Sequence, residues 1–202
     1  MFDAALRRLI DPPLNRAGCA LAAVGVGPDA VTLTGLALGL GAAGIIALGA
    51  PLIALIPLLL GRVADGLDGA VARASAPTDF GGFLDIMADF VVYGAVPFAF
   101  AVADPEANAL AAAFLIFSFF ANGSAFLAFA ATAERRKMKN EAQGVKTLYY
   151  VSGLLEGGET IAFFAVICLA PDWFSPLAWA FGALCFVSAV ARMALAARIF
   201  RG

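Results

Sequence analysis

The chain alternates between long apolar runs and short polar breaks. A helix needs about 20 apolar residues to cross the hydrocarbon of a bilayer, and six runs of about that length follow one another. They are Ala30–Gly49, Leu52–Ala72, Phe80–Ala103, Ala107–Ala133, Thr147–Ala170 and Phe174–Ala194. The pattern therefore predicts an all-α integral membrane protein with six transmembrane helices.

The first 27 residues have a different pattern. Residues 2–10 place four large apolar side chains on one face of a helix: Phe2, Leu6, Leu9 and Ile10. This periodicity is typical of an amphipathic helix that lies in the membrane interface. We expect Pro12 and Pro13 to end that helix, because proline has no N–H to donate. Residues 1–27 are thus predicted to be an interfacial segment of one membrane domain that covers residues 1–202.

The composition supports a membrane protein and excludes several functions. Of the 202 residues, 62% are hydrophobic and 14% are charged, and the mean hydropathy is +0.92; soluble domains are less apolar and carry more charge. Without histidine, a histidine base, a histidine-bound metal and a Ser-His-Asp triad are excluded. The net charge of −2 gives no indication of nucleic-acid binding. The isolated cysteines Cys19, Cys168 and Cys185 are expected to be packing residues.

Basic residues fall on one side of the predicted membrane. With six spans, that side holds Arg7, Arg8, Arg16, Arg73, Arg135, Arg136, Lys137, Lys139, Lys146, Arg192, Arg198 and Arg201. The loops on the other side, at Ala50, 104–106 and 171–173, contain no Lys or Arg. Because basic loops stay in the cytoplasm, we expect a multi-pass protein of the cell (inner) membrane with both termini cytoplasmic.

Four aspartates interrupt the second and third apolar runs: Asp65, Asp68, Asp85 and Asp89. A charge at a bilayer centre costs about 2.5–3.5 kcal/mol, so four within one short stretch indicate function. Spacings of three and four residues place each pair on one helical face. A turn at 77–79, with Asp79 expected to cap the next helix, brings the two faces together. The result is a predicted recess that opens to the cytoplasm.

Four facing carboxylates favour a divalent metal pair. Ligand sets made only of oxygen suit Mg²⁺ or Mn²⁺, and two such ions can clamp the attacking and leaving oxygens of a phosphoryl displacement. Small residues in the same stretch would let a large ligand such as a nucleotide approach the backbone. These small residues are Gly69, Ala72, Gly81 and Gly82.

The residues from Asp65 to Asp89 read D-x₂-D-G-x₂-A-R-x₇-G-x₃-D-x₃-D. This spacing resembles the signature of the CDP-alcohol phosphatidyltransferases, although the x₇ spacer is one residue shorter than is usual there. The resemblance implies attack of an alcohol hydroxyl on the β-phosphorus of a CDP-linked lipid, such as CDP-diacylglycerol, with release of CMP. It also implies a small alcohol acceptor, a pair of Mg²⁺ or Mn²⁺ ions and a homodimer.

The resemblance assigns roles to individual residues. It implies that Asp65, Asp68 and Asp85 hold the metals, and that Asp89 is a further ligand, the general base, or both. It also implies that four residues form the CDP site: Gly69, Ala72, Gly81 and the nearby Arg73.

A second, weaker similarity lies at Pro28-Asp29-Ala30-Val31-Thr32. Many family members have Pro-Asn-x-x-Thr before the first span. Here we expect Asp29 to be a helix N-cap, and a nucleotide contact by Thr32 is the alternative.

The acceptor stays open at this point. Arg135, Lys146 and Arg192 would suit an anionic acceptor such as glycerol 3-phosphate or inositol phosphate, but the basic run from Arg135 also fits an ordinary cytoplasmic loop. Residues 93–97, Tyr-Gly-Ala-Val-Pro, resemble instead a motif of serine-using members.

Three further charges lie inside the predicted spans. Arg62 and Glu156 are expected at about the same depth, ~15 Å from the cytoplasmic ends of their helices. We therefore expect Arg62 to pair with Glu156 or Glu159; binding of a cationic acceptor such as choline by these acids is the alternative. The small residues Ser118, Gly123 and Ser124 would permit close helix contact, a hint of dimerisation.

Membrane phospholipid synthesis is the leading functional hypothesis. An ion carrier or proton-coupled carrier is the alternative, because intramembrane carboxylates also mark transport paths. The acids cluster near one face and none continue across the membrane, which favours the enzyme. An inactive scaffold is a third class, against which the intact motif argues.

Overall fold

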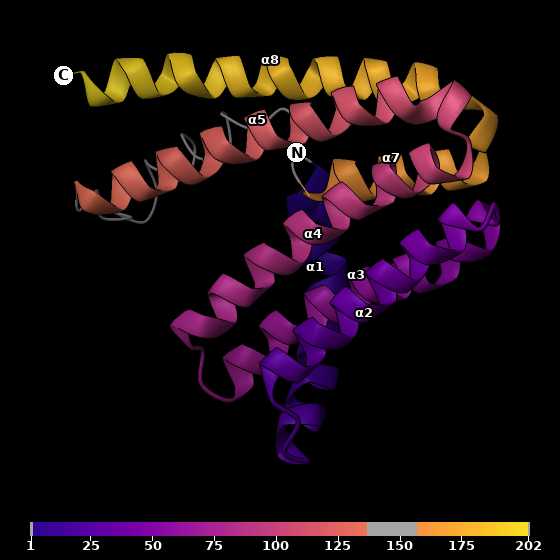
Figure 1. Ribbon diagram of the computed structural model, residues 1–202. Coiled ribbons are helices and arrows are strands. Elements are labelled where there is room, and N and C mark those ends of the chain that lie inside the picture. The colour runs from indigo at the N-terminus through magenta and orange to yellow at the C-terminus, as the bar shows by residue number, and fades with distance from the viewer. Residues whose placement is uncertain (1, 137–156, 202) are drawn as a thin grey trace.

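The computed structural model describes residues 2–136 and 157–201, and it gives side-chain detail from Pro12 onward. This part of the chain is helical and contains no strand (Figure 1). The α-helices are α1 (Phe2–Ala23), α2 (Pro28–Ala47), α3 (Pro51–Ala74), α4 (Asp79–Ala103), α5 (Pro105–Arg135), α7 (Gly157–Leu169) and α8 (Phe174–Phe200), with a short 3-10 turn, η1 (Pro171–Trp173), before α8.

The helices confirm an all-α fold with several membrane-spanning candidates. In the described part, α2, α4, α5 and the stretch from η1 through α8 are long and apolar enough to cross a membrane. Helix α3 has a similar length, 24 residues, but carries Arg62, Asp65 and Asp68 among its apolar side chains. Helix α7 is described over 13 residues. The number of six spans stays a prediction.

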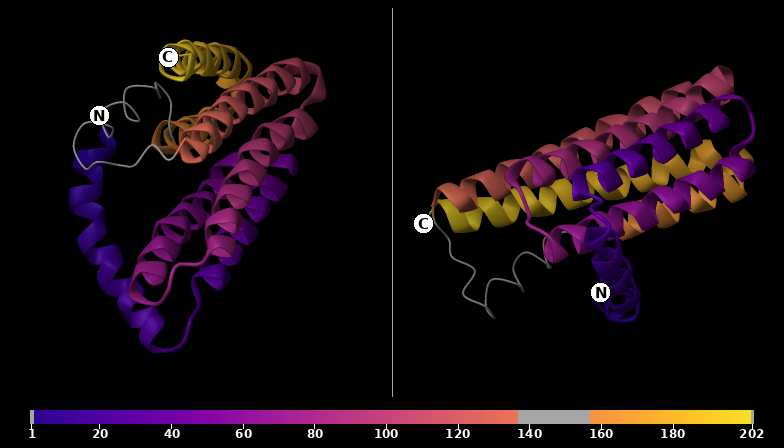
Figure 2. Two further views of the ribbon diagram at one scale, coloured as in Figure 1. Left: turned by 90° about the vertical axis from the view of Figure 1, so that its left-hand side faces the viewer. Right: turned by 90° about the horizontal axis from the view of Figure 1, so that it is seen from below.

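Helix α1 contradicts one sequence expectation. Pro12 and Pro13 lie inside this helix and do not end it. An internal proline costs about 3 kcal/mol, but packing beyond the prolines supports the helix. Gly18 lies directly against the Ala70 backbone of α3, and the side chain of Leu14 reaches Gly66. The right-hand view of Figure 2 shows α1 leaving the bundle at a steep angle; its place in the membrane interface stays a prediction.

Helix α2 organises the half of the bundle that carries the aspartates. Helices α3 and α4 make their main contacts with α2 rather than with each other. Two glycines permit this packing. Gly35 lies against the carbonyl oxygen of Gly61, and Gly39 leaves room for the side chain of Val92. As a result, α3 and α4 lie side by side on α2, and polar side chains occupy the space where the two helices face each other.

The other half of the bundle is held by aromatic packing. Helix α5 packs on α8 and α4, and α7 packs on α3. Phe100 stacks on Phe174 with ring centroids 4.5 Å apart, and Phe163 stacks on Phe181 at 4.2 Å. These rings belong to, or pack against, one core that reaches from α2 to α8.

Small residues of α5 are used within the chain. Gly182 of α8 lies beside Ser118, and Gly123 lies beside the ring of Phe90 in α4. Both α5 residues are buried, whereas Ser124 is exposed. Two of the three residues that hinted at dimerisation therefore explain packing between the chain's own helices. The homodimer stays a prediction.

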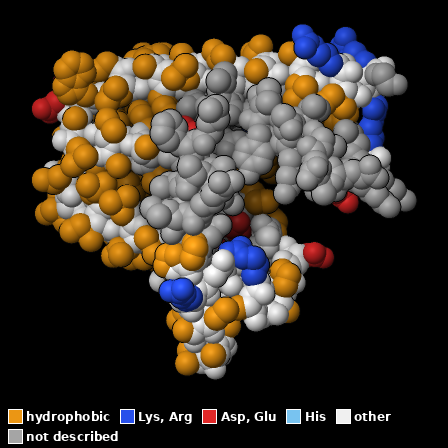
Figure 3. Space-filling view, turned by 180° about the vertical axis from the view of Figure 1, so that it is seen from behind, with side chains coloured by type: hydrophobic (Ala, Val, Ile, Leu, Met, Phe, Trp, Pro, Cys, Tyr) orange, Lys and Arg blue, Asp and Glu red, His pale blue; other side chains and the backbone are white. Residues whose placement is uncertain are grey.

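The outer surface is strongly apolar. Many large hydrophobic side chains are exposed on α2 to α5 and on α8. In Figure 3 they cover much of one half of the molecule, while Lys and Arg gather at the opposite and lower margins. Cys168 and Cys185 are buried, as expected, but Cys19 is exposed. That expectation was wrong because α1 packs on α3 through Gly18, which leaves its neighbour Cys19 on the outside.

Candidate active site

The four aspartates of α3 and α4 face one another. The charges of Asp68, Asp85 and Asp89 all act on Asp65. Because both helices rest on α2, the faces that carry these acids turn toward a common space. The cluster is thus built by the spacing within each helix and by the shared support of α2.

Helix caps hold the open end of this space in shape. Thr78 caps α4, because its hydroxyl accepts a hydrogen bond from the Gly81 N–H at 3.0 Å. Asp79 is the first residue of that helix, so the expectation that it forms the cap was wrong. The cap of α2 is Gly27, followed by Pro28. Asp29 therefore lies in the first turn, where its charge suits the helix dipole, and is not the N-cap that we expected.

A cavity of about 190 Å³ opens beside two of the acids. Its lining consists of Pro28, Thr32, Asp68, Gly69, Ala72, Pro77, Thr78, Gly81, Gly82 and Asp85. Thr32 donates its hydroxyl proton to Asp68 Oδ2 at 2.5 Å and also lies 3.2 Å from the Pro28 carbonyl oxygen. We call Thr32, Asp68, Asp85 and this cavity the outer half of the site.

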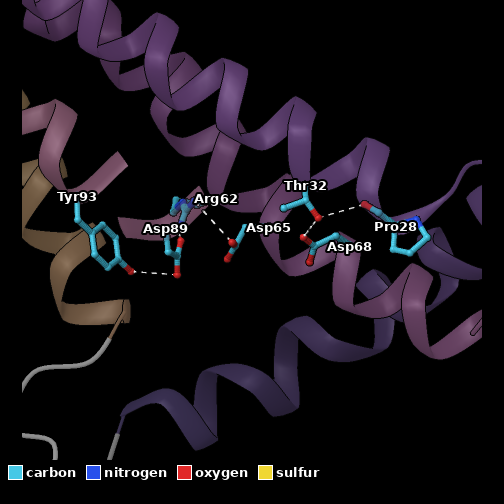
Figure 4. A network of polar contacts seen from close by, with 7 residues as sticks. All are labelled: Pro28, Thr32, Arg62, Asp65, Asp68, Asp89 and Tyr93. Atoms are coloured by element: carbon cyan, nitrogen blue, oxygen red, sulfur yellow. Dashed lines mark hydrogen bonds and ion pairs between the residues drawn. The ribbon is translucent and has the colours of Figure 1, made fainter. Parts of the chain in front are cut away.

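The other two acids are held by cationic and phenolic partners. Arg62 Nη1 lies 2.5 Å from Asp89 Oδ1, and Arg62 Nη2 lies 3.6 Å from Asp65 Oδ1. Tyr93 donates its hydroxyl proton to Asp89 Oδ2 at 3.4 Å. Figure 4 shows these side chains in a row that continues toward Asp68. We call Arg62, Asp65, Asp89 and Tyr93 the inner half of the site.

The expected pairing of Arg62 with Glu159 was wrong. Among the described residues, Arg62 pairs with Asp65 on its own helix and with Asp89 across on α4, and not with Glu159. Glu156, the other expected partner, lies outside the described residues. The expectation rested on Arg62 and Glu156 lying at about the same depth in the membrane. It did not identify the helix face that Arg62 meets, and α2 brings Asp89 to that face.

The donor set suits a hard divalent cation, because all four acids offer oxygen. Among the described residues, however, no three acidic side chains are grouped closely enough to hold one ion. The hydrogen bonds explain this: Asp89 is held by Arg62 and Tyr93, and Asp68 by Thr32. The residues fit Mg²⁺ or Mn²⁺ in chemistry and in number, provided that the carboxylates exchange their present partners for the ion.

Three of the four residues expected near a nucleotide line the cavity: Gly69, Ala72 and Gly81. The fourth, Arg73, is not part of that lining; it donates to Asn15 Oδ1 of α1 at 3.0 Å.

The residues expected at an acceptor site are placed elsewhere. Arg135 is exposed near the end of α5. Arg192 is buried between α8 and α5, where it donates to the carbonyl and side-chain oxygens of Asn122 at 3.1 and 3.0 Å and lies over the ring of Phe126. Neither arginine lines the cavity, and Lys146 falls outside the described residues.

Sequence reasoning did not assign Tyr93 to the aspartate cluster or pair Arg62 with Asp89. Both carry a signal in the spacing. Tyr93 follows Asp89 by four residues, and Arg62 precedes Asp65 by three. Each therefore shares a helical face with an acid. Antiparallel helices then bring the inner ends of the two faces together.

The family model of the CDP-alcohol phosphatidyltransferases matches residues 26–191. The chain belongs to this family. The inner membrane protein YnjF of Escherichia coli is 48% identical over 193 residues, which cover 96% of this chain and 94% of that protein. The archaetidylinositol phosphate synthase of Pyrococcus horikoshii is 39% identical over 85 residues, 42% of this chain and 45% of that protein. Every element of the aspartate cluster lies within the family match.

Solved structures share the fold of this family member. The phosphatidylinositol phosphate synthase PgsA1 of Mycobacterium tuberculosis with CDP-DAG bound has a TM-score of 0.71 and 20% identity, covering 91% of this chain and 93% of that one. The same enzyme in complex with manganese and citrate has a TM-score of 0.68 and 20% identity, covering 90% and 88%. At this identity the likeness shows a common arrangement of helices.

Proposed function

We propose that this protein is a multi-pass inner-membrane enzyme of phospholipid synthesis, a single domain that transfers a substituted phosphate group from a CDP-linked lipid to an alcohol. The oxygen of the acceptor hydroxyl attacks the β-phosphorus, the bond from that phosphorus to the oxygen of CMP breaks, and CMP leaves. The hydroxyl proton passes to a carboxylate. Because the chain contains no histidine, an aspartate is the natural base, and we assign this role to Asp89.

One observation carries the proposal. The cavity beside Asp68 and Asp85 is lined by Gly69, Ala72 and Gly81, the small residues of the family motif. Small side chains let a nucleotide approach the helix backbone, and the two acids lie at the same place. A cavity of this composition suits a cytidine diphosphate better than an ion path, which would need polar groups across the whole membrane.

The chain's own residues would prepare the site for the donor. Thr32 fixes one oxygen of Asp68 through its hydrogen bond, which keeps the other oxygen available. Thr78 and Gly81 hold the start of α4 beside the cavity. Arg73, bound to Asn15, lies beside Gly69 of the cavity lining and would be close to the donor there.

A divalent metal would be held by Asp65, Asp68 and Asp85, with Asp89 as a further ligand or as the base. When bound, such ions neutralise charge on the diphosphate and favour its displacement. The manganese in one PgsA1 structure supports Mn²⁺ or Mg²⁺ as the ion. We propose two ions, because four carboxylates carry enough charge for a pair.

The acceptor and the orientation of the site are also proposals. The names of PgsA1 and of the Pyrococcus enzyme make inositol phosphate the first acceptor to test, followed by glycerol 3-phosphate, serine and choline. Arg135, Lys146 and Arg192 are candidate contacts for an anionic acceptor. The distribution of basic residues favours a site that opens to the cytoplasm. A homodimer is the assembly that we expect.

The test is release of CMP from CDP-diacylglycerol by membranes that contain the protein. We expect release that depends on Mn²⁺ or Mg²⁺ and on one acceptor of the panel. Membranes from the same host without the protein are the control. No release with any of the four acceptors, from protein that is inserted and folded, would count against the proposal.

A further inference from the structure

Arg62 occupies the position of a cation within the aspartate cluster. Its guanidinium contacts Asp89 and Asp65 at once, and Asp65 also experiences the charges of Asp68 and Asp85. The side chain of Arg62 is 13% exposed, so it is largely removed from solvent. One fixed positive charge thus lies among four carboxylates that would otherwise repel one another.

The same contact joins two helices. Arg62 belongs to α3 and Asp89 to α4, and these helices make their main contacts with α2 rather than with each other. The Arg62–Asp89 pair therefore crosses the space between them (Figure 4). A divalent ion bound by acids of both helices would make the same kind of connection.

We propose that Arg62 is a built-in cation that takes the place of a divalent metal on Asp65 and Asp89 when no metal is bound, and that the metal must displace it. This inference rests on the proposed function only in taking the four aspartates as metal ligands. Arg62 then acts as a positioning residue that reduces the negative charge of the empty site and joins α3 to α4 there, at the cost of metal affinity.

The contacts explain why release of Arg62 is required. Asp89 has one oxygen on Arg62 and the other on Tyr93. A metal that uses Asp89 must therefore replace at least one of these partners. Among the described residues, Asp68 and Asp85 form no ion pair of this kind, and the side chain that donates to Asp68 is the neutral hydroxyl of Thr32. The first ion is therefore expected at the outer half, and the second must compete with Arg62.

The experiment compares Mn²⁺ binding by the purified protein and by Arg62→Gln, with free Mn²⁺ measured by electron paramagnetic resonance. Glutamine keeps a polar side chain but removes the charge. We expect tighter binding by about tenfold for at least one ion, which corresponds to ~1.4 kcal/mol. Arg198→Gln is the matched control: it removes one positive charge at an exposed position of α8, and its Mn²⁺ affinity should equal that of the parent.

Thermal unfolding of the same samples gives a second readout. Without metal, Arg62→Gln should unfold at a lower temperature than the parent, because the four carboxylates lose their cation. Added Mn²⁺ should remove most of this difference. A variant destabilised for ordinary packing reasons would stay less stable at every Mn²⁺ concentration, and that result would contradict the proposal.

Arg62→Lys covers the case in which Arg62→Gln does not fold. Lysine keeps the charge but cannot present two N–H groups in a fixed fork, so we expect a gain in Mn²⁺ affinity of about threefold. Unchanged or weaker Mn²⁺ binding in the folded variants would overturn the inference. These measurements do not depend on CMP release, so they test the role of Arg62 even if the protein does not catalyse the proposed reaction.

Discussion

The two halves of the site neutralise their acids in different ways. In the outer half, Asp68 accepts a hydrogen bond from Thr32 beside a cavity lined with small residues. In the inner half, Asp65 and Asp89 share the guanidinium of Arg62, and none of these three residues lines the cavity. Asp68 of the outer half and Asp65 of the inner half lie next to each other on α3 (Figure 4).

This difference indicates that the outer half binds a ligand, whereas the inner half also stabilises the fold. A neutral hydroxyl leaves the charge of Asp68 available to a cation or substrate. An ion pair in which the side chain of Arg62 is 13% exposed and that of Asp89 31% compensates Asp89 within the protein, and loss of one partner is costly because the other charge stays behind. The outer half should therefore affect activity more than stability, and the inner half should affect both.

Asp68→Ala should have the largest effect on activity. We expect CMP release to fall on the order of a thousandfold, about 4 kcal/mol, because an oxygen ligand beside the donor cavity is lost. Membrane insertion and the unfolding temperature should change little. Asp172→Ala, at an exposed turn before α8, is the control for loss of one acid. Activity near the parent value would remove Asp68 from the proposed machinery.

Asp89→Ala should reveal the support given by the inner half. It leaves Arg62 with only the longer contact to Asp65, so we expect a loss of about 3 kcal/mol in unfolding free energy, together with loss of CMP release. Thermal unfolding in detergent measures the first effect. If Asp89→Ala unfolds at the same temperature as Asp68→Ala, the distinction between the two halves fails.

Thr32→Val tests how the outer half is held. Valine has nearly the same shape but lacks the hydroxyl that donates to Asp68. Hydrogen bonds to charged groups contribute about 1.5–3 kcal/mol, so CMP release should fall by at least tenfold. Thr34→Val, which removes an exposed hydroxyl bonded to the Ala30 carbonyl, should retain full activity. Equal effects of the two substitutions would show that the Thr32–Asp68 contact is unimportant.

Tyr93→Phe should have the smallest effect. The lost hydrogen bond to Asp89 is long, 3.4 Å, while phenylalanine keeps the ring contacts with Phe119 and Phe164. We expect a change of about twofold or less in CMP release, since weak hydrogen bonds contribute little. A loss comparable with that of Asp89→Ala would mean that Tyr93, and not only Arg62, controls the inner half.

Several features of the fold and site were predictable because they depend on local spacing. The apolar runs gave the described helices to within a few residues at most ends, since helix length follows from the run of apolar side chains. The three- and four-residue spacings put each pair of aspartates on one face. The small residues at Gly69, Ala72 and Gly81 marked the cavity for the same reason: all are close to the acids in sequence.

Other features depended on contacts between distant segments. Helix α1 continued through Pro12 and Pro13, and it packs on α3 beyond them. The N-caps of α2 and α4 are Gly27 and Thr78, two residues and one residue before the expected Asp29 and Asp79. The exact start of a helix depends on how the preceding loop enters it.

By itself, the sequence determined an apolar helical protein with four aspartates in two spaced pairs and the motif of its family. Only the tertiary structure decided which group neutralises each acid. Helical periodicity fixes the residues that share a face of one helix, but not the face of another helix that they meet. Here α2 determines which faces meet. Its glycines Gly35 and Gly39 let α3 and α4 pack closely on it, and Arg62 of α3 therefore contacts Asp89 of α4.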